Sequence, residues 1–152
     1  MKTPKETLEL FLANTTNPEV LRHIIEADAT YISLNFSNPE LKKILPWTGT
    51  RKGPNAFIYT FAGVNEFWTI NAFEVQEIFA ENENVAVFGS FSYTSKTLNQ
   101  QATSPFSILA KVRNGKIYHF MFMEDTFATA ATFKVSGKVT YHSDPLKGEV
   151  EI

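Results

Sequence analysis

The chain has 152 residues, of which 43% are apolar and 20% charged, and its formal net charge is -2. This predicts one globular domain, and the lack of a basic stripe excludes binding to nucleic-acid phosphates. The absence of cysteine excludes disulfides and thiol chemistry, and without an apolar run long enough for a signal peptide or a membrane span we expect a cytoplasmic protein.

In the N-terminal third of the chain, the spacing of apolar residues predicts mainly helices. The expected order is a helix over 4–13, a helix opening at Asn17-Pro18, a strand over 29–36, a short helix over 38–45, a turn-rich connector over 46–57 and a helix opening at Gly53-Pro54. Proline suits the first turn of a helix because its missing N–H needs no partner there.

From residue 68 onward the pattern predicts strands, over 68–80, 85–97, 103–113 and 116–124. Asn114-Gly115 is typical of a two-residue type I′ hairpin turn, and Asp125 is placed to cap a closing helix over 125–133. The last stretch is broken by glycine and proline. We therefore divide the chain into a domain, residues 1–133, and a weakly packed C-terminal tail, residues 134–152.

Helices followed by antiparallel strands predict an α+β fold. On strand 103–113 the alternation places one set inward: Ser104, Phe106, Ile108, Ala110 and Val112. On strand 116–124 the inward set is Tyr118, Phe120, Phe122 and Glu124, and the outward set is Ile117, His119, Met121 and Met123. Fourteen phenylalanines indicate that rings line the core or a cavity.

Four stretches together resemble one family. They are "EADATY", "PWTGTRKGPNAF", "FEVQEIFAENENVAVFG" and "VRNGKI…EDTFATAA". In order and spacing they are similar to the SnoaL-like and ketosteroid isomerase-like proteins of the nuclear transport factor 2-like superfamily. The resemblance implies a cone-shaped, curved and mainly antiparallel sheet wrapped around the N-terminal helices, with an internal pocket.

The resemblance also marks positions at which enzymes of this family carry ionisable groups. Those positions fall here on Ser33, Ile108 and Phe122, and the first helix has no tyrosine to match the isomerase tyrosine. Proton transfer beside a carbonyl needs a base and a donor to the developing oxyanion, and these residues supply neither in the usual places. Whether the chain is an enzyme stays open.

We predict that the pocket binds a small apolar or amphipathic molecule, without metal or cofactor. The predicted lining is Tyr31, Ser33, Trp47, Phe57, Phe61, Phe106, Ile108, Phe122 and Glu124. Phe57 and Phe61 have core packing as a simpler role, and Glu124 either lines the mouth of the pocket or pairs with a cation at its rim. The histidines are too far apart in sequence to favour a metal site.

Three functions remain as alternatives. The favoured one is a binding domain that lacks the usual isomerase acids. The second is an isomerase- or cyclase-type enzyme with an atypical site, built on Tyr31 and Glu124. The third is an interaction module, because Leu109, Ile117, Met121 and Met123 are predicted to form an outer apolar patch that suits a homodimer through the sheet face.

Overall fold

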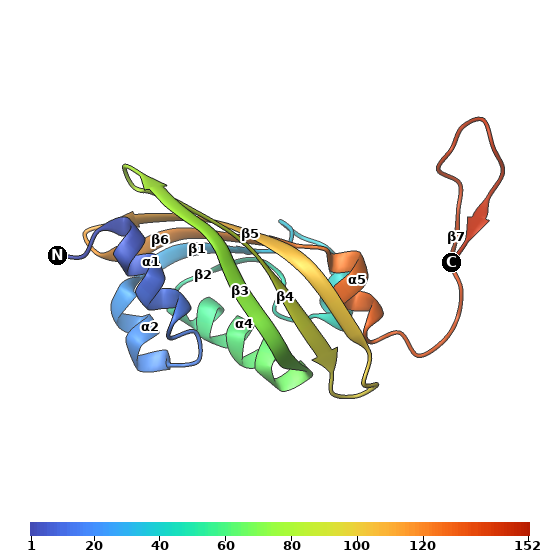
Figure 1. The fold of residues 1–152 in the computed structure, drawn as a ribbon, viewed down its shortest axis with the longest axis horizontal. Coiled ribbons are helices and arrows are strands. Elements are labelled where there is room, and N and C mark those ends of the chain that lie inside the picture. The colour runs from blue at the N-terminus through green and yellow to red at the C-terminus, as the bar shows by residue number, and fades with distance from the viewer.

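The computed structural model describes residues 1–152, in which a curved six-stranded sheet lies over helices on one of its faces (Figure 1). The strand order is β2-β1-β6-β5-β4-β3, and the β1–β6 pair is parallel whereas the other pairs are antiparallel. The predicted α+β fold is therefore confirmed.

The helices are α1 (Pro4–Leu12), α2 (Pro18–Ile24), α3 (Pro39–Ile44), α4 (Pro54–Phe67) and α5 (Thr126–Ala131). The sheet strands are β1 (Ile25–Ser33), β2 (Gly49–Lys52), β3 (Trp68–Glu81), β4 (Asn84–Ser95), β5 (Gln101–Arg113) and β6 (Lys116–Glu124).

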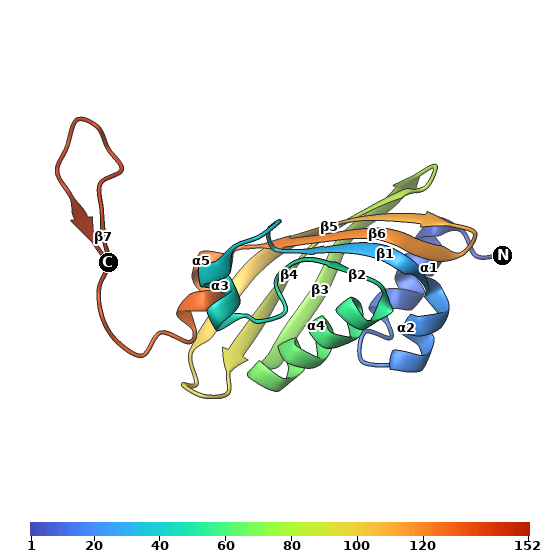
Figure 2. The ribbon, with the colours of Figure 1, turned by 180° about the vertical axis from the view of Figure 1, so that it is seen from behind.

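The helices divide between a face and an end of the sheet. Helices α1, α2 and α4 lie against the concave face, and α3 and α5 lie at the end from which the C-terminal tail leaves (Figures 1 and 2). The opposite face of the sheet is covered by no helix (Figure 2). None of the helices is both long and apolar enough to cross a membrane.

Local sequence explains where the helices begin. The Thr3 hydroxyl accepts the Glu6 N–H at 3.1 Å, and the Glu6 carboxylate accepts the Thr3 N–H at 3.0 Å, which forms a complete capping box. Asn17 and Asn38 cap α2 and α3 more simply: each side-chain oxygen accepts one backbone N–H, from Val20 and Leu41, and each stands before a proline. Gly53 has a φ of 83°, a value that favours glycine, and its N–H donates to Ala29 O at 2.8 Å before α4 begins.

Two boundaries differ from the sequence prediction. The first strand runs over Ile25–Ser33 and not over 29–36, because Leu34 has a φ of 68° and turns the chain out of the sheet. The connector 46–57 contains strand β2, which pairs with β1 at the sheet edge. Its Gly-Thr-Arg-Lys sequence lacks apolar alternation, so the strand carried no periodic signal.

A bulge in β6 overturns part of the predicted inward and outward sets. Lys111 pairs with His119 and Val112 pairs with Ile117, so Tyr118 is an extra residue and the alternation shifts there. Ile117 is consequently fully buried, and its predicted place in the outer patch is wrong. Tyr118, predicted inward, instead lies under the Arg113 guanidinium, 4.1 Å from its ring centroid.

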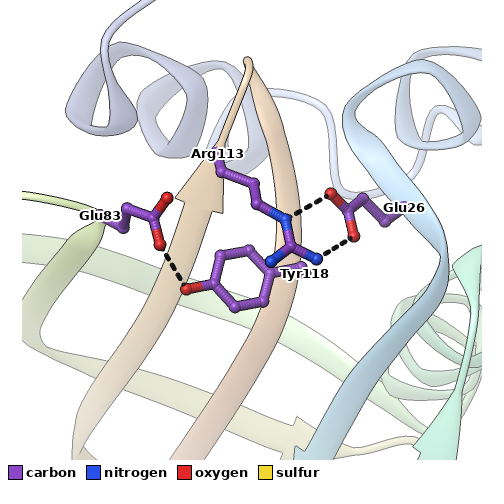
Figure 3. A network of polar contacts seen from close by, with 4 residues as sticks. All are labelled: Glu26, Glu83, Arg113 and Tyr118. Atoms are coloured by element: carbon purple, nitrogen blue, oxygen red, sulfur yellow. Dashed lines mark hydrogen bonds and ion pairs between the residues drawn. The ribbon is translucent and has the colours of Figure 1, made fainter.

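Tyr118 belongs to a polar network that joins three parts of the fold (Figure 3). Its hydroxyl donates to the Glu83 carboxylate at 2.7 Å, in the β3–β4 turn. Arg113 donates through Nε and Nη2 to both carboxylate oxygens of Glu26 in β1, each at 3.1 Å. These bonds tie the β5–β6 hairpin to β1 and to the β3–β4 turn. The side chains are solvent-accessible, so the network forms no part of a cavity.

Aromatic rings fill the space between the helices and the sheet. Phe11 of α1 packs against Phe57, Phe61 and Phe120, with ring centroids 4.9–6.0 Å apart. Tyr31 packs 4.6 Å from Phe57. These edge and tilted contacts join α1, α4, β1 and β6 into one core.

Residues 134–152 form an arm that leaves the body after α5 (Figure 1). Strands β7 (Thr140–Tyr141) and β8 (Val150–Glu151) pair with each other and with no strand of the main sheet. Every residue of this tail is exposed.

We expect that removal of residues 134–152 lowers the free energy of unfolding by less than about 1 kcal/mol, because little apolar surface is lost. Phe133→Ala is the matched control, since this ring packs 5.0 Å from Trp68 and is held in the body. It should cost about 3 kcal/mol in urea unfolding. A truncation that costs as much as the control would show that the tail is an integral part of the domain.

Candidate functional site

The concave side of the sheet contains two adjoining chambers. The acid chamber, of about 30 Å³, is lined by Tyr31, Ser33, Leu34, Leu45, Trp47, Thr60, Phe61, Val64, Trp68, Phe73, Tyr93, Phe122 and Glu124. The apolar chamber, of about 180 Å³, is lined by Phe11, Leu12, Thr15, Phe61, Val64, Asn65, Ile70, Phe73, Tyr93, Ile108, Phe120 and Phe122. Five residues line both, so the two chambers form one two-ended site between α4 and the sheet.

Most of the residues predicted from the sequence line these chambers. Six of the nine line the acid chamber: Tyr31, Ser33, Trp47, Phe61, Phe122 and Glu124. Ile108 lines the apolar chamber. Phe57 and Phe106 line neither: Phe57 is fully buried in the core, and Phe106 lies behind the wall and stacks 5.3 Å from Phe122.

The three positions singled out by the family resemblance are neighbours in the sheet. Ser33 on β1 pairs with Phe122 on β6, and Phe122 pairs with Ile108 on β5. All three are buried. This row therefore presents one hydroxyl and two apolar side chains to the site, with no ionisable group.

The one carboxyl group among the residues that line the two chambers belongs to Glu124. It lies two residues beyond Phe122 on the same face of β6, opposite Phe106. Its Oε2 atom is buried and has no hydrogen-bond partner. This oxygen is therefore enclosed, although the residue as a whole is only half-buried and also lines an open surface hollow beside Phe106 and Met123. No cation pairs with the carboxyl.

Burial raises the pKa of Glu124 to about 7, because the charged form loses its hydration. The Thr129 hydroxyl acts in the opposite direction, and the nearby Asp125 raises the pKa further. Asp125 itself caps α5 by accepting the Ala128 N–H at 3.1 Å, as predicted. Near neutral pH, Glu124 can thus both accept and release a proton.

Two tyrosines face this carboxyl. Burial raises the pKa of Tyr31 above its ordinary value and the Glu124 charge raises it further, while Ser33 and Thr60 act in the opposite direction. For Tyr93, burial and then the Glu124 charge raise the pKa. Both phenols consequently stay protonated at neutral pH and are hydrogen-bond donors beside a carboxyl group.

Three side chains absent from the predicted lining, Val64, Phe73 and Tyr93, line both chambers. Buried and less buried residues alternate along β4, and Tyr93 is in step with the buried Val87 and Phe91. The face of the sheet on which Tyr93 lies could therefore have been predicted from the sequence. Phe73 was harder to find, because the β3–β4 register shifts between Ile70 and Ala72. This bulge brings Ile70 and Phe73 to the same chamber although they are three residues apart.

Glycine explains how Trp47 reaches the acid chamber. A Cβ atom on Gly63 of α4 would lie 2.4 Å from Cε3 of the Trp47 ring. The absence of that atom lets the indole pack against the helix, where it also meets Trp68 at 5.7 Å.

Other ionisable groups do not join this site. His119 lies outside both chambers, and burial, followed by the Lys111 and Lys52 charges, lowers its pKa. No group of three or more histidine, aspartate and glutamate side chains is arranged to hold a metal ion.

Sequence comparison identifies close relatives. The chain is 41% identical to patulin synthesis protein F of Aspergillus clavatus over 133 residues, which cover 85% of this chain and 67% of that protein. It is 39% identical to patulin biosynthesis cluster protein F of Penicillium expansum, covering 87% of this chain and 69% of that protein. The chain belongs to the family of patulin synthesis protein F. No protein-family model matches the sequence.

Comparison with solved structures shows that this chain has the nuclear transport factor 2-like fold. A nuclear transport factor 2-like protein from Burkholderia thailandensis matches with a TM-score of 0.74 and 19% identity, covering 88% of this chain and 99% of that one. TerC, co-crystallised with polyporic acid, matches with a TM-score of 0.69 and 21% identity, covering 86% and 98%. The family resemblance read from the sequence is confirmed at the level of fold.

We expect Glu124→Gln to change how stability depends on pH. The ordinary carboxyl pKa is 4.5 and the folded value is about 7, so the native state binds more protons than the unfolded state between these values. Stability of the parent protein should therefore fall as pH rises through this window, by about 3 kcal/mol from this group.

The comparison uses urea unfolding of both proteins at about pH 4.5 and about pH 8. The amide introduced by Glu124→Gln does not titrate, so the stability of the variant relative to the parent should rise over this range. Equal pH dependence in the two proteins would show that the carboxyl is solvated in the folded state.

Proposed function

We propose that the chain is an enzyme of secondary metabolism that moves a proton on a small oxygenated molecule, with Glu124 as the general acid and base. The observation that carries the proposal is the buried Glu124 carboxyl, whose Oε2 has no partner and which shares its chamber with Tyr31 and Tyr93. Burying an unpaired ionisable group is costly, so its presence here favours a functional role.

The proposed step is an isomerisation through an enolate. The Glu124 carboxylate takes a proton from a carbon beside a carbonyl, and the C–H electron pair moves to form the enolate. A tyrosine hydroxyl donates a hydrogen bond to the developing oxyanion. The carboxylic acid then returns its proton to another carbon, so atoms and electrons balance without a co-reactant.

The relatives support this class of substrate. The two proteins that share about 40% identity are named for patulin synthesis, which points to a role in making a small secondary metabolite. A fold relative was co-crystallised with polyporic acid. The apolar chamber would hold the carbon skeleton, and the acid chamber would hold an oxygen atom.

A second candidate is ligand binding without chemistry, which the sequence favoured. The row of Ser33, Phe122 and Ile108 supports it, because these residues stand where related enzymes carry ionisable groups. Under this alternative the Glu124 carboxyl only donates or accepts a hydrogen bond to the ligand.

Conversion of cyclohex-3-enone to its conjugated isomer, followed by ultraviolet absorbance, distinguishes the two candidates. We expect Glu124→Gln to lower the rate by roughly 10²–10⁴-fold. The rate should also rise with pH around a midpoint of about 7, because the carboxylate is the base. Glu77→Gln is the control, since Glu77 lies exposed on β3 and lines neither chamber. Turnover that survives in Glu124→Gln would contradict the assignment, and binding of the ketone without turnover would favour the second candidate.

We further propose that two copies associate through the uncovered face of the sheet. With Ile117 removed from the predicted patch, Leu109, Met121 and Met123 remain, and two exposed rings extend it. These are Phe88 and Phe79, which are 47% and 56% exposed and stack 6.2 Å apart. Exposed apolar side chains that adjoin in this way favour an interface.

Phe88→Lys should weaken the dimer by at least about tenfold, because a charge would be buried without a partner. Sedimentation velocity over a concentration series measures the effect. Val135→Lys, in the exposed tail, is the control and should change nothing. A parent protein that stays monomeric throughout the series would refute the proposed dimer.

A further inference from the structure

Phe73 stands between the two chambers and solvent. It lines both chambers, yet its side chain is 40% exposed. The bulge in β3 brings it to the same wall as Ile70, which is 39% exposed and lines the apolar chamber. Any ligand that occupies these chambers must therefore fit beside the Phe73 ring.

The position of this ring is fixed by a stack of phenylalanines. The Phe73 ring lies 4.6 Å from Phe106 at an interplanar angle of 21°, and Phe106 lies 5.3 Å from Phe122 at 7°. Gly89 makes room for the middle ring, because a Cβ atom there would lie 2.6 Å from Cε1 of Phe106. The wall cannot retreat from the chamber without disturbing three strands.

The space left by this wall is small and nearly uncharged. The apolar chamber has a volume of about 180 Å³, and an apolar cavity of about 150 Å³ in another protein is known to hold one benzene molecule. No lysine, arginine or histidine lines either chamber. An anionic ligand would therefore be buried beside Glu124 without a counter-charge.

We infer that Phe73 is a specificity-determining residue that restricts the site to uncharged molecules of a single ring. This deepens the proposed function and rests on its use of the two chambers as the ligand site. It does not require that Glu124 transfers a proton. The inference concerns the size of the ligand, and the proposed function concerns the chemistry.

Calorimetric titration with phenol and 2-naphthol tests the inference, because these neutral probes carry the same hydroxyl on one ring and on two. At about pH 6 the parent protein should bind phenol at least about tenfold more tightly than 2-naphthol. Phe73→Ala should raise the affinity for 2-naphthol at least about tenfold over the parent, since it removes the ring that limits the space. Val75→Ala is the control: Val75 lies two residues away on the same strand, is similarly exposed at 42% and lines neither chamber.

Cooperative urea unfolding confirms that each variant is folded, because a partly folded protein also binds apolar probes. Phe73→Leu serves as the second variant should the alanine variant not fold. Equal affinity of the parent for both probes, no phenol binding, or no gain in a folded Phe73 variant would overturn the inference. The same titrations and the cyclohex-3-enone assay, both carried out on Glu124→Gln, together separate the two proposals. If that variant keeps the ring-size preference but shows no loss of turnover relative to the parent, the proposed chemistry fails and the size limit stands.

Discussion

Contacts between aromatic rings hold the helices against the sheet and determine the space that remains between them. Phe11, Tyr31, Phe57 and Phe120 pack ring against ring, and this leaves Phe57 fully buried behind the chamber walls. Toward α5 the rings form a wall instead of a cluster. The stack of Phe73, Phe106 and Phe122 runs along the sheet and faces α4. The cavity exists because the rings of β3, β5 and β6 stack on one another and leave the α4 side free.

This arrangement explains why one carboxyl dominates the electrostatics of the site. Rings and aliphatic side chains supply almost no compensating dipole, so burial is the largest cause of the raised pKa of Glu124. The same surroundings raise the pKa of both tyrosines. One apolar environment thus keeps the phenols protonated and brings the carboxyl into the range where it exchanges protons near neutral pH.

Much of the fold was accessible from the sequence, because local signals coincide with the true boundaries. Asn114 and Gly115 have φ values of 51° and 72°, as a type I′ turn requires, and Asp125 caps α5. Errors arose where the period of two breaks. The bulge at Tyr118 reversed the assignment of Ile117, and the bulge near Asn71 concealed Phe73. A bulge depends on the pairing of two strands and leaves no mark in the period of one strand.

The candidate site was predictable in position but not in chemistry. Parity placed Glu124 and Phe122 on the same face, yet it could not show whether the carboxyl reached a cation or was enclosed. Enclosure depends on rings that come from α4, β3 and β4, all far away in sequence. Ser33, Phe122 and Ile108 mark where the usual acids are missing, and Glu124 lies one step further along β6, toward α5. The ionisable group of this wall therefore stands two residues away from the position that the family resemblance marks. Under the proposed function, the reacting carbon of a ligand must therefore lie toward the α5 end of the cavity, where Tyr31 and Tyr93 line the same chamber as Glu124.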